Sequence, residues 1–392
     1  MSGALGRFKV VDLTQARAGP ACVRILSDMG AEVIQVIRPR SENSDSTFSG
    51  SDNSNLHRNK RSIGIDLQKE EGRKVFLRLV KDADVVVENF RADVKRRLRI
   101  DYETLSAINP RLVYGSISGF GQDGPYGPRP GVDQIAQGLG GIMSVTGPPG
   151  TGPWRVGIAV CDMAAGMFLA HAILGALLER EFSGQGQWVH TSLLEAAIAM
   201  QDFQAMRWLS NHEVPEQAGN EHPVGFPTGV FETADGLINL SAGSDHQLRA
   251  FLQELGLSDL LEDERFRDRA TRRRNRQQLI EECSAKIRER QTEDLIEKLN
   301  QAGVPAGPIL TMDKVFADPQ VAHLGMAQEI ETRYFGTVPL LRSPFNLTRT
   351  PTSLRLPSPQ TGEHTSEILR ENGFDEAEIA ELSSRGIVST VT

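Results

Sequence analysis

The sequence is poor in cysteine and in aromatic residues, with 3 cysteines and 6% Phe, Trp and Tyr among 392 residues. Cys22, Cys161 and Cys283 stand far apart without metal-ligand spacing, which suits a reducing cytosol and predicts no metal site. The net charge of −8 gives no global attraction for nucleic acid or for an anionic membrane. Residues 1–6 are short and polar, unlike a signal peptide. We therefore expect a cytoplasmic protein that binds neither nucleic acid nor a membrane.

The opening of the chain lacks the Gly-x-Gly-x-x-Gly fingerprint of a dinucleotide site, although it has the order of a βαβ unit. Residues 8–13 predict a buried strand, 21–29 a helix and 31–37 a second strand. Arg38 follows that strand, where an NAD enzyme often has an acid for the ribose. A lone arginine is most often a surface charge, but a cation here suits a phosphorylated ribose better than a free diol. The opening predicts a doubly wound α/β sheet and argues against an NAD-dependent dehydrogenase.

Two later strands also end in groups that suit ligand binding, because loops at the carboxyl ends of such strands bind ligands in this fold class. The strand predicted at 84–90 contains Asn89 and precedes a basic turn at 91–99, and the strand at 112–121 has a glycine-rich exit. A solvated charge run explains the basic turn equally well. The remaining pattern predicts a mobile loop at 41–55, a strand at 59–67, an amphipathic helix at 70–81, an apolar helix from 131 and a helix at 193–209.

The longest apolar run, residues 158–178, predicts a helix packed on most sides, with Asp162 at its front end. A carboxylate is costly to bury unless something uses it, and the start of a helix is where an anion is tolerated best. Spacing alone favours Asp162 as a simple helix cap. The run is long enough to cross a bilayer, but it contains Asp162 and His171 and follows polar sequence without a basic anchor. A buried core helix is therefore the prediction.

The second half of the chain predicts a separate folding unit, since 392 residues exceed one ordinary domain. Residues 211–228 are polar and contain Asn, Gly and Pro, which predicts a linker. Two short strands flank Asp235-Gly236, a hairpin turn signal, and charged helices follow. A second linker is predicted at 316–339, and residues 340–392 supply further strands and a final acidic helix.

Short motifs along nearly the whole chain resemble those of the class III CoA-transferases, the group that includes formyl-CoA transferase and carnitine CoA-transferase. No single motif is diagnostic, but their order and spacing together are specific. Besides Asp162 within its helix, the matching segments are Ala18-Gly19-Pro20-Ala21, Gly30-Ala31-Glu32-Val33-Ile34, Asn59-Lys60-Arg61-Ser62, Glu88-Asn89-Phe90, Gly119-Phe120-Gly121, Asp133 to Gln137, Gly184-Gln185-Gly186-Gln187, Ala306-Gly307-Pro308 and Gly362-Glu363-His364-Thr365.

The resemblance implies an α/β fold and an interlocked homodimer in which each chain is threaded through a hole in its partner. A large Rossmann-like domain would be built from both ends of the chain, residues 1–210 and 340–392. A smaller α+β domain, residues 229–315, would be inserted between the linkers at 211–228 and 316–339.

The resemblance also assigns roles to residues and reverses the preference for Asp162 as a cap, because the family nucleophile falls on this carboxylate. CoA would be a substrate, as acyl-CoA, and no cofactor would be tightly bound. Arg17 and Ala18 would lie beside the CoA thiol, and Asp133 would neighbour the nucleophile. The other positions implied to hold CoA are Arg38, Ile65, Asp66, Leu67, Gln68, Asn89, Phe90, Arg91 and Arg97.

The implied chemistry moves CoA from an acyl-CoA to a free carboxylic acid. Asp162 attacks the thioester carbonyl and forms a mixed anhydride, releasing CoA thiolate. The thiolate then attacks the Asp162 carbonyl to give an aspartyl-CoA thioester, and the acceptor acid takes CoA by the reverse steps. No ATP is needed, but water must be excluded because either intermediate can hydrolyse. Backbone N–H groups at the start of the Asp162 helix are candidate oxyanion donors.

Two alternatives to a transferase follow from the same resemblance. The α-methylacyl-CoA racemases of the family place a histidine base immediately before the acid that matches Asp133, and here that position is Val132. Valine cannot move a proton, so the racemase hypothesis is the weaker one. A CoA-binding protein without turnover is the other alternative, and it would need Asp162 to be a spectator.

Two positions in the thiol-side loop differ from formyl-CoA transferase: Gln15 stands where that enzyme has histidine, and Arg17 is the other. Arg17 stands where that enzyme has glutamine, and a bidentate cation there predicts recognition of a second carboxylate and hence short dicarboxylic substrates. A contact of Arg17 with the CoA diphosphate or with an acid of the protein is an equal alternative. The run of glycines that forms a lid in formyl-CoA transferase is also missing, and residues 225–229 and 241–244 are weaker candidates.

Overall fold

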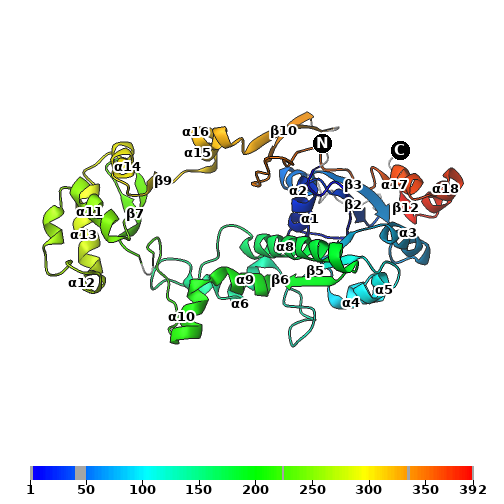
Figure 1. Cartoon of the computed structure of the whole chain (residues 1–392), viewed down its shortest axis with the longest axis horizontal. Helices are drawn as coiled ribbons and strands as arrows, with labels where there is room; N and C mark the ends of the chain where they lie inside the picture. Colours follow the sequence, from blue (N-terminus) through cyan, green and yellow to red (C-terminus); the bar gives the residue numbers. More distant parts are fainter. Residues whose placement is uncertain (1–2, 40–49, 223–224, 333–335, 391–392) are drawn as a thin grey trace. The chain divides into compact units, whose positions relative to one another are not determined.

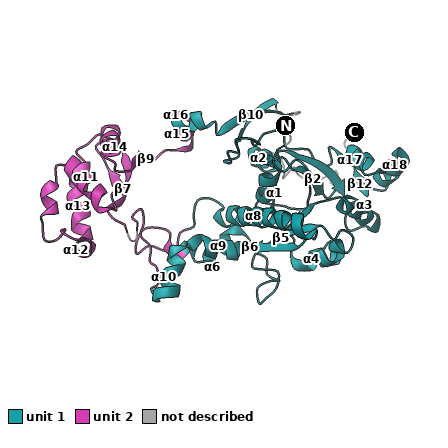
Figure 2. Cartoon of the chain, in the orientation of Figure 1, with its two compact units in different colours: residues 1–143, 155–213, 320–392 teal, residues 144–154, 214–319 magenta. Residues whose placement is uncertain are grey.

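The computed structural model describes residues 3–39, 50–222, 225–332 and 336–390. The chain divides into two compact units (Figure 2). The large unit comprises Met1–Met143, Arg155–Glu213 and Gln320–Thr392, and the small unit comprises Ser144–Trp154 and Val214–Pro319. The range 229–315, expected to form the inserted domain, lies inside the small unit. Both expected linkers contribute to both units, and residues 223–224 and 333–335 of those linkers lie outside the described residues.

The large unit is organised around a seven-stranded sheet of order β12-β3-β2-β1-β4-β5-β6 (Figure 1). Its strands pair in parallel, except that β12 is antiparallel to β3. Strands β1, β2 and β4 contain adjacent Val or Ile residues, as expected for a parallel sheet that is covered on both faces. The strands are β1 (Lys9–Asp12), β2 (Glu32–Ile37), β3 (Lys60–Ile65), β4 (Val85–Glu88), β5 (Val113–Ser118), β6 (Trp188–Ser192) and β12 (Val388–Ser389).

Two hydrophobic clusters cover the two faces of this sheet. Alternation along β1 sends Val10 into the cluster under α1 and α8, and Val11 into the cluster under α3 and α17. The helices of the large unit are α1 (Ala18–Asp28), α2 (Ser51–His57), α3 (Glu70–Lys81), α4 (Ala92–Leu98), α5 (Tyr102–Ser106), α6 (Asp133–Leu139), α7 (Ile142–Val145, which runs into the small unit), α8 (Val160–Ser183), α9 (Leu193–Gln201), α10 (Phe203–Asn211), α16 (Pro319–Leu324), α17 (Thr365–Glu371) and α18 (Glu376–Ser384).

Helix α8 has the length and apolar composition that would allow it to cross a membrane, and half of that stretch is buried inside the protein. Its buried residues include Ala165, Leu169 and Ile173, which belong to the core cluster shared with α1 and β5. Gly115 on β5 lets Ile173 approach the sheet closely, because a Cβ there would meet the Ile173 side chain at 3.0 Å. The helix therefore forms the core of the large unit, as its sequence predicted.

The small unit contains a three-stranded antiparallel sheet with its own hydrophobic core. The hairpin predicted around Asp235-Gly236 is confirmed, and Asp235 Oδ1 accepts hydrogen bonds from the backbone N–H (2.8 Å) and the hydroxyl (2.6 Å) of Thr292. Its elements are β7 (Thr228–Glu232), β8 (Leu237–Ser241), α11 (Asp245–Glu254), a 3-10 helix (Ser258–Leu261), α12 (Arg269–Arg274), α13 (Arg276–Ile287), α14 (Thr292–Gln301), β9 (Ala306–Pro308) and α15 (Met312–Ala317).

Several local expectations were wrong. Residues 51–55 of the expected loop belong to α2, whose last turn is held by Arg58 through the Asn55 carbonyl (3.1 Å); residues 41–49 lie outside the described residues. The expected basic turn is helix α4, which ends at Arg99 with a left-handed φ of 55°. The helix expected at 193–209 breaks at Asp202, where φ is 41°. The second linker contains α16 and the hairpin of β10 (Ala327–Thr332) and β11 (Gly336–Leu341).

Candidate active site

A pocket of about 120 Å³ lies in the large unit where the carboxyl ends of β1, β4 and β5 meet the first turns of α1 and α8. Because these strands are parallel, their carboxyl ends share one edge of the sheet, where ligands bind in this fold class. Five residues predicted for the site line this pocket: Arg17, Ala18, Asn89, Asp133 and Asp162. The remaining lining residues are Ala16, Ile117, Ser118, Gly119, Gly131, Val132 and Leu193.

Asp162 is the third residue of α8 and is half-buried in this pocket. Burial and, to a smaller extent, the charge of Asp133 raise the pKa of its carboxyl from 3.8 to about 6, and the charge of Arg17 opposes both effects. Within the described part of the chain, no donor bonds to the Asp162 carboxylate oxygens. A carboxylate that is desolvated and not stabilised by hydrogen bonds is a stronger nucleophile when ionised, so the geometry favours reactivity over anion stability.

Asp133, the first residue of α6, caps the N-terminus of α8, the helix that carries Asp162. Its Oδ1 accepts the backbone N–H of Cys161 at 2.9 Å and that of Asp162 at 3.4 Å, while its Oδ2 accepts the Gln137 amide at 2.7 Å. The N-cap residue of α8, Ala159, has no side chain for this role. The expectation that these N–H groups stabilise oxyanions was therefore wrong, because Asp133 occupies them.

The start of α1, unlike that of α8, has backbone N–H groups that are available to an oxyanion. The backbone N–H groups of Ala18 and Gly19 have no hydrogen-bond partner among the described residues, and no side chain caps this helix. Ala18 lines the pocket beside Asp162. The two helices approach closely at Gly166, one turn after Asp162, where a Cβ would lie 2.7 Å from the Ala18 carbonyl oxygen. Two free N–H groups at a helix start form a site suited to negative charge.

The loop that leads from β1 into α1 is fixed at three points. The Asn89 amide bonds both backbone groups of Gln15, accepting its N–H and donating to its carbonyl, each at 2.8 Å. Asp12 Oδ1 accepts the N–H (2.8 Å) and the hydroxyl (2.6 Å) of Thr14. Ala16 adopts a left-handed φ of 58°, which is strained for a residue with a Cβ. These contacts set the position of Arg17 and Ala18.

Arg17 is paired with an acid of the protein, Asp52 on α2, with Nη2 and Oδ2 2.5 Å apart. Its side chain is 35% exposed and that of Asp52 is 63% exposed. The sequence left open whether Arg17 binds a substrate carboxylate, the CoA diphosphate or an acid of the protein. In this structure it contacts an acid of the protein. Because the pair is exposed to solvent, its free energy is small and a ligand can displace it.

The other residues implied to hold CoA do not line this pocket, although all of them except Arg97 lie at the carboxyl ends of β2, β3 and β4, on the same edge of the sheet. Arg38 Nη2 approaches Gln68 Oε1 at 3.5 Å, and Arg91 pairs with Asp93 at 3.3 Å. Phe90 packs against the second core cluster, as does Leu67, and the Ile65 side chain is buried. Asp66 accepts the backbone N–H of Gln68 at 3.1 Å, and Arg97 is exposed on α4.

The glycine-rich exit of β5 closes one side of the pocket. Gly119 and Gly131 cross so closely that a Cβ on either would lie 2.6 Å from the Cα of the other. Both lid candidates, residues 225–229 and 241–244, belong to the small unit, whereas the pocket belongs to the large unit.

Sequence reasoning missed the buried ion pairs beneath the site. Lys60 Nζ lies 2.8 Å from Asp12 Oδ2, and both side chains are fully buried. Lys95 Nζ, on α4, bonds Glu88 at 2.9 Å and Gln122 at 2.7 Å, joining the exits of β4 and β5. The only signal was a lysine within otherwise buried strand sequence, since a buried cation requires a partner.

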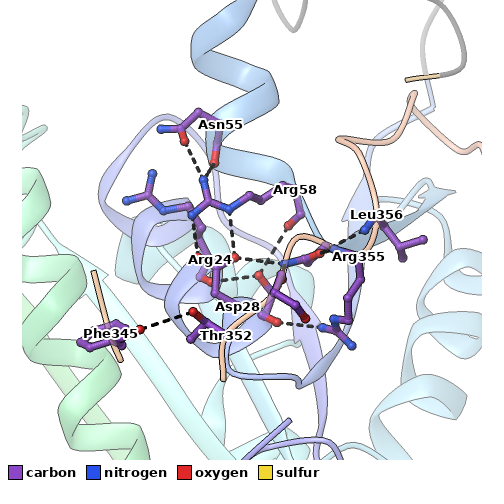
Figure 3. A network of polar contacts seen from close by, with 11 residues as sticks. Arg24, Asp28, Asn55, Arg58, Phe345, Thr352, Arg355 and Leu356 are labelled. Atoms are coloured by element: carbon purple, nitrogen blue, oxygen red, sulfur yellow. Dashed lines mark hydrogen bonds and ion pairs between the residues drawn. The ribbon is translucent and has the colours of Figure 1, made fainter. Parts of the chain in front are cut away.

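A second buried network holds the far end of α1 (Figure 3). Arg58 bonds both carboxylate oxygens of Asp28, at 2.9 and 2.6 Å, and Asn59 donates to the same carboxylate at 3.0 Å. Asn59 Oδ1 accepts the backbone N–H of Arg355, whose guanidinium donates to the Ser27 carbonyl at 2.7 Å. The network therefore ties α1 to residues near the C-terminal end of the chain.

Comparison with known proteins decides the family. Residues 5–365 match the CoA-transferase family III. The chain belongs to this family. It is 37% identical to the succinate–glutarate CoA-transferase of Agrobacterium fabrum, over 94% of this chain and 95% of that protein. It is 34% identical to the succinyl-CoA:mesaconate CoA-transferase of Haloarcula marismortui, over 95% of this chain and 97% of that one.

A solved structure of the same family has the same fold. The CaiB/BaiF family protein from Brucella suis superposes with a TM-score of 0.82 and 37% identity, over 95% of this chain and all of that chain. The α/β fold and the family resemblance predicted from the sequence are thereby confirmed. The motifs quoted above are accordingly those of a family III CoA-transferase.

Proposed function

We propose that this family III CoA-transferase moves CoA from an acyl-CoA thioester to a small dicarboxylic acid, with Asp162 as the covalent nucleophile. The observation that carries the proposal is the Asp162 carboxylate itself: half-buried, with a pKa raised to about 6 and facing a pocket that also holds a cation, Arg17. At neutral pH this carboxylate is ionised and free of hydrogen-bond donors in the described part of the chain, which suits a nucleophile.

The proposed reaction exchanges bonds at one carbonyl at a time. An oxygen of Asp162 attacks the thioester carbon of the donor, and the C–S bond breaks. CoA thiolate departs, and a mixed anhydride between Asp162 and the donor acid remains. The thiolate attacks the Asp162 carbonyl carbon and expels the donor acid. The acceptor carboxylate then attacks this aspartyl-CoA thioester, and the expelled thiolate takes the acceptor acyl group, which restores the Asp162 carboxylate. The free N–H groups of Ala18 and Gly19 are the proposed oxyanion donors.

The proposed path of CoA follows the edge of the sheet away from the pocket. Arg38, Arg91 and Arg97 are the cations offered to the phosphates, and residues 65–68 offer backbone groups beside Gln68. Asn89 lines the pocket and Phe90 follows it in the chain, so that the thiol end would reach Ala18 and Asp162. No tightly bound cofactor is included in this proposal.

A dicarboxylate is the proposed acid because Arg17 can bind a second carboxylate while the first reacts at Asp162. Two relatives that share about a third of the residues are named for succinate, glutarate and mesaconate. Each of these acids carries two carboxylates. A short diacid held by one end at a fixed guanidinium presents its other end within a confined pocket.

We also propose the interlocked homodimer. Large apolar side chains are exposed on three consecutive helices of the large unit, and exposed apolar patches of this kind mark interfaces. They are Met167, Phe168, Leu178 and Phe182 on α8, Ile198 and Met200 on α9, and Phe203, Met206, Trp208 and Leu209 on α10. A cytoplasmic location is proposed from the three buried, unpaired cysteines. Sedimentation of the purified protein tests the dimer.

Trapping the acyl-enzyme tests the function. Incubation with succinyl-CoA and hydroxylamine should place a hydroxamate on Asp162, detected by mass spectrometry of the peptide, and CoA should pass from succinyl-CoA to glutarate. Asp162→Asn, checked for deamidation, should abolish both. Transfer that persists in this variant would contradict the proposal. Loss of an α-deuteron from a 2-methylacyl-CoA would indicate a racemase, although Val132, which lines the pocket, is no proton carrier.

A further inference from the structure

The Arg17–Asp52 ion pair joins the pocket to a helix that takes no part in lining it. Arg17 lines the pocket, whereas Asp52 lies in the first turn of α2. Their side chains are separated by 2.5 Å and both remain in contact with solvent. An acid of the protein therefore occupies the cation that the proposed function offers to a substrate carboxylate. Since both are carboxylates, they compete for one guanidinium.

A second cation near this pair lies on α1, for which Arg17 is the N-cap residue. Arg24 follows Arg17 by two helical turns, and its guanidinium has no hydrogen bond or ion pair among the residues that the structure describes. Figure 3 shows its side chain beside that of Arg58, which is already committed to Asp28 and Asn55. Burial and the charges of Arg58 and Arg17 lower the pKa of Arg24, and the charges of Asp28 and Asp52 raise it. Of the two described carboxylates whose charges act on Arg24, Asp28 is already bonded to Arg58 and Asn59, whereas Asp52 is paired with Arg17.

We propose that Asp52 is a specificity-determining residue that competes with the substrate carboxylate for Arg17. When a diacid displaces Asp52 from Arg17, Asp52 forms an ion pair with Arg24 instead. The inference rests on the proposed function, because it concerns the distal carboxylate of the acid bound at Asp162. With a dicarboxylate, the substrate carboxylate replaces Asp52 at Arg17 and Asp52 moves toward Arg24, so each carboxylate keeps a cationic neighbour. With a monocarboxylate, nothing displaces Asp52 and the pair stays closed.

The arrangement makes the diacid's affinity depend on two residues that never touch it. Asp52 weakens diacid binding by the free energy of its pair with Arg17, which is small because the pair is exposed. Arg24 lowers that cost by offering the released carboxylate another cation. A monocarboxylate of the same length avoids the competition entirely, so the ratio of the two affinities reports the exchange.

Steady-state transfer from succinyl-CoA to glutarate and to pentanoate tests the proposal. Asp52→Asn should lower KM for glutarate about two- to fivefold, the range that exposed ion pairs span. Arg24→Gln should raise KM for glutarate by a similar factor. Neither variant should change KM for pentanoate, whereas KM for succinyl-CoA should follow that for glutarate, because the succinyl group also carries a free carboxylate for Arg17. Glu181→Gln is the matched control, because it breaks an equally exposed pair, Glu181–Arg7, at the other end of α8.

Calorimetric titration of glutarate into the enzyme with CoA separates this proposal from the proposed function. Asp52→Asn should bind glutarate more tightly than the wild type. The double variant Asp52→Asn/Asp162→Asn should likewise bind it more tightly than Asp162→Asn, in which no reaction occurs. An unchanged or raised KM and Kd for glutarate in Asp52→Asn would overturn the exchange, as would equal changes for pentanoate. Wild-type enzyme that binds glutarate as described but forms no hydroxamate on Asp162 would overturn the mechanism alone.

Discussion

The Asp133 carboxylate lies against the backbone of Asp162, whose N–H group points to Asp133 Oδ1 at 3.4 Å, beside the stronger bond from Cys161 at 2.9 Å. One acid thus caps the helix that carries the other. The same closeness places two negative charges together, and the charge of Asp133 is the second cause, after burial, of the raised pKa of Asp162.

Asp133→Asn should therefore lower the pKa of Asp162 while keeping an oxygen that can accept the helix N–H groups. In the wild type, kcat/KM should fall with acid as the pH drops through about 6, because the nucleophile must be ionised. In the variant, this acid limb should move to lower pH. Asp133→Ala should move it equally and should also lose about 1 kcal/mol of stability, since the cap is gone. An acid limb that stays in place would contradict the coupling.

The free energy of unfolding should also depend on the protonation of Asp162, and the raised pKa fixes the direction of the change. The pKa of Asp162 is raised from 3.8 to about 6 in the folded protein, so folding favours its protonated form. The stability that this provides is present below pH 3.8 and is lost as the pH rises through about 6. Asp162→Asn should stabilise the protein at pH 7.5 by about 1–2 kcal/mol after allowance for solvent screening.

Urea denaturation at several pH values measures this effect. The gain of Asp162→Asn over the wild type should shrink as the pH is lowered toward 4. A gain that is independent of pH would show that the carboxylate charge is not its origin.

The approach of α1 to α8 makes a third prediction. Gly166→Ala places a methyl group 2.7 Å from the Ala18 carbonyl oxygen and 3.1 Å from Ala21, so the helices must separate. We expect destabilisation of about 1–3 kcal/mol and a lower kcat, because the Ala18 and Gly19 N–H groups move away from Asp162. Gly175→Ala on the same helix is the control, since nothing lies within 4 Å of its Cβ and alanine favours helices. Equal behaviour of the two variants would refute the packing argument.

The buried Lys60–Asp12 pair makes a fourth. Lys60→Met leaves Asp12 buried without its cation, which should cost about 3–5 kcal/mol in urea denaturation. Because Asp12 also bonds Thr14, kcat should fall as the loop to Arg17 loosens. Adding Asp12→Asn should restore part of the stability. Lys81→Met, at an exposed position on α3, should change stability by less than about 0.5 kcal/mol.

The buried elements were the predictable ones. The Val and Ile runs at 8–13, 31–37 and 84–90 give β1, β2 and β4 within a few residues, and the helix expected at 70–81 is α3. A strand covered on both faces appears in the sequence as a continuous apolar run, and an amphipathic helix appears as apolar residues repeated every three to four positions. Both signals are present in the local sequence.

Elements stabilised by distant polar contacts were not predictable. Helix α2 is polar throughout most of its length, and Arg58 bonds both Asn55 and Asp28, which no local pattern encodes. Helix α4 had a weak signal, an acid in its first turn and cations in its last, which complement the helix dipole. Its position depends on the bond between Lys95 and Glu88.

The site divides in the same way. Asp162 stood out as a carboxylate at the front of an apolar helix, but only the family resemblance gave it a catalytic role and predicted Asp133 as its neighbour. Local sequence could not predict the cap that Asp133 forms on the Asp162 helix or the pair of Asp52 with Arg17, because these residues lie 29 and 35 positions apart in sequence. Such pairs form only once the strand order has brought β1, β4 and β5 together.

The position of β12 has a consequence for biosynthesis. Val388 pairs with Ile65, and the Gly362 N–H donates to the Ser62 hydroxyl, so the outer edge of β3 is covered by a segment that leaves the ribosome about 300 residues after it. By then every strand of the small unit has already emerged. Until β12 emerges, the nascent chain carries an unpaired edge on β3 that can pair with a neighbouring chain on the same polysome.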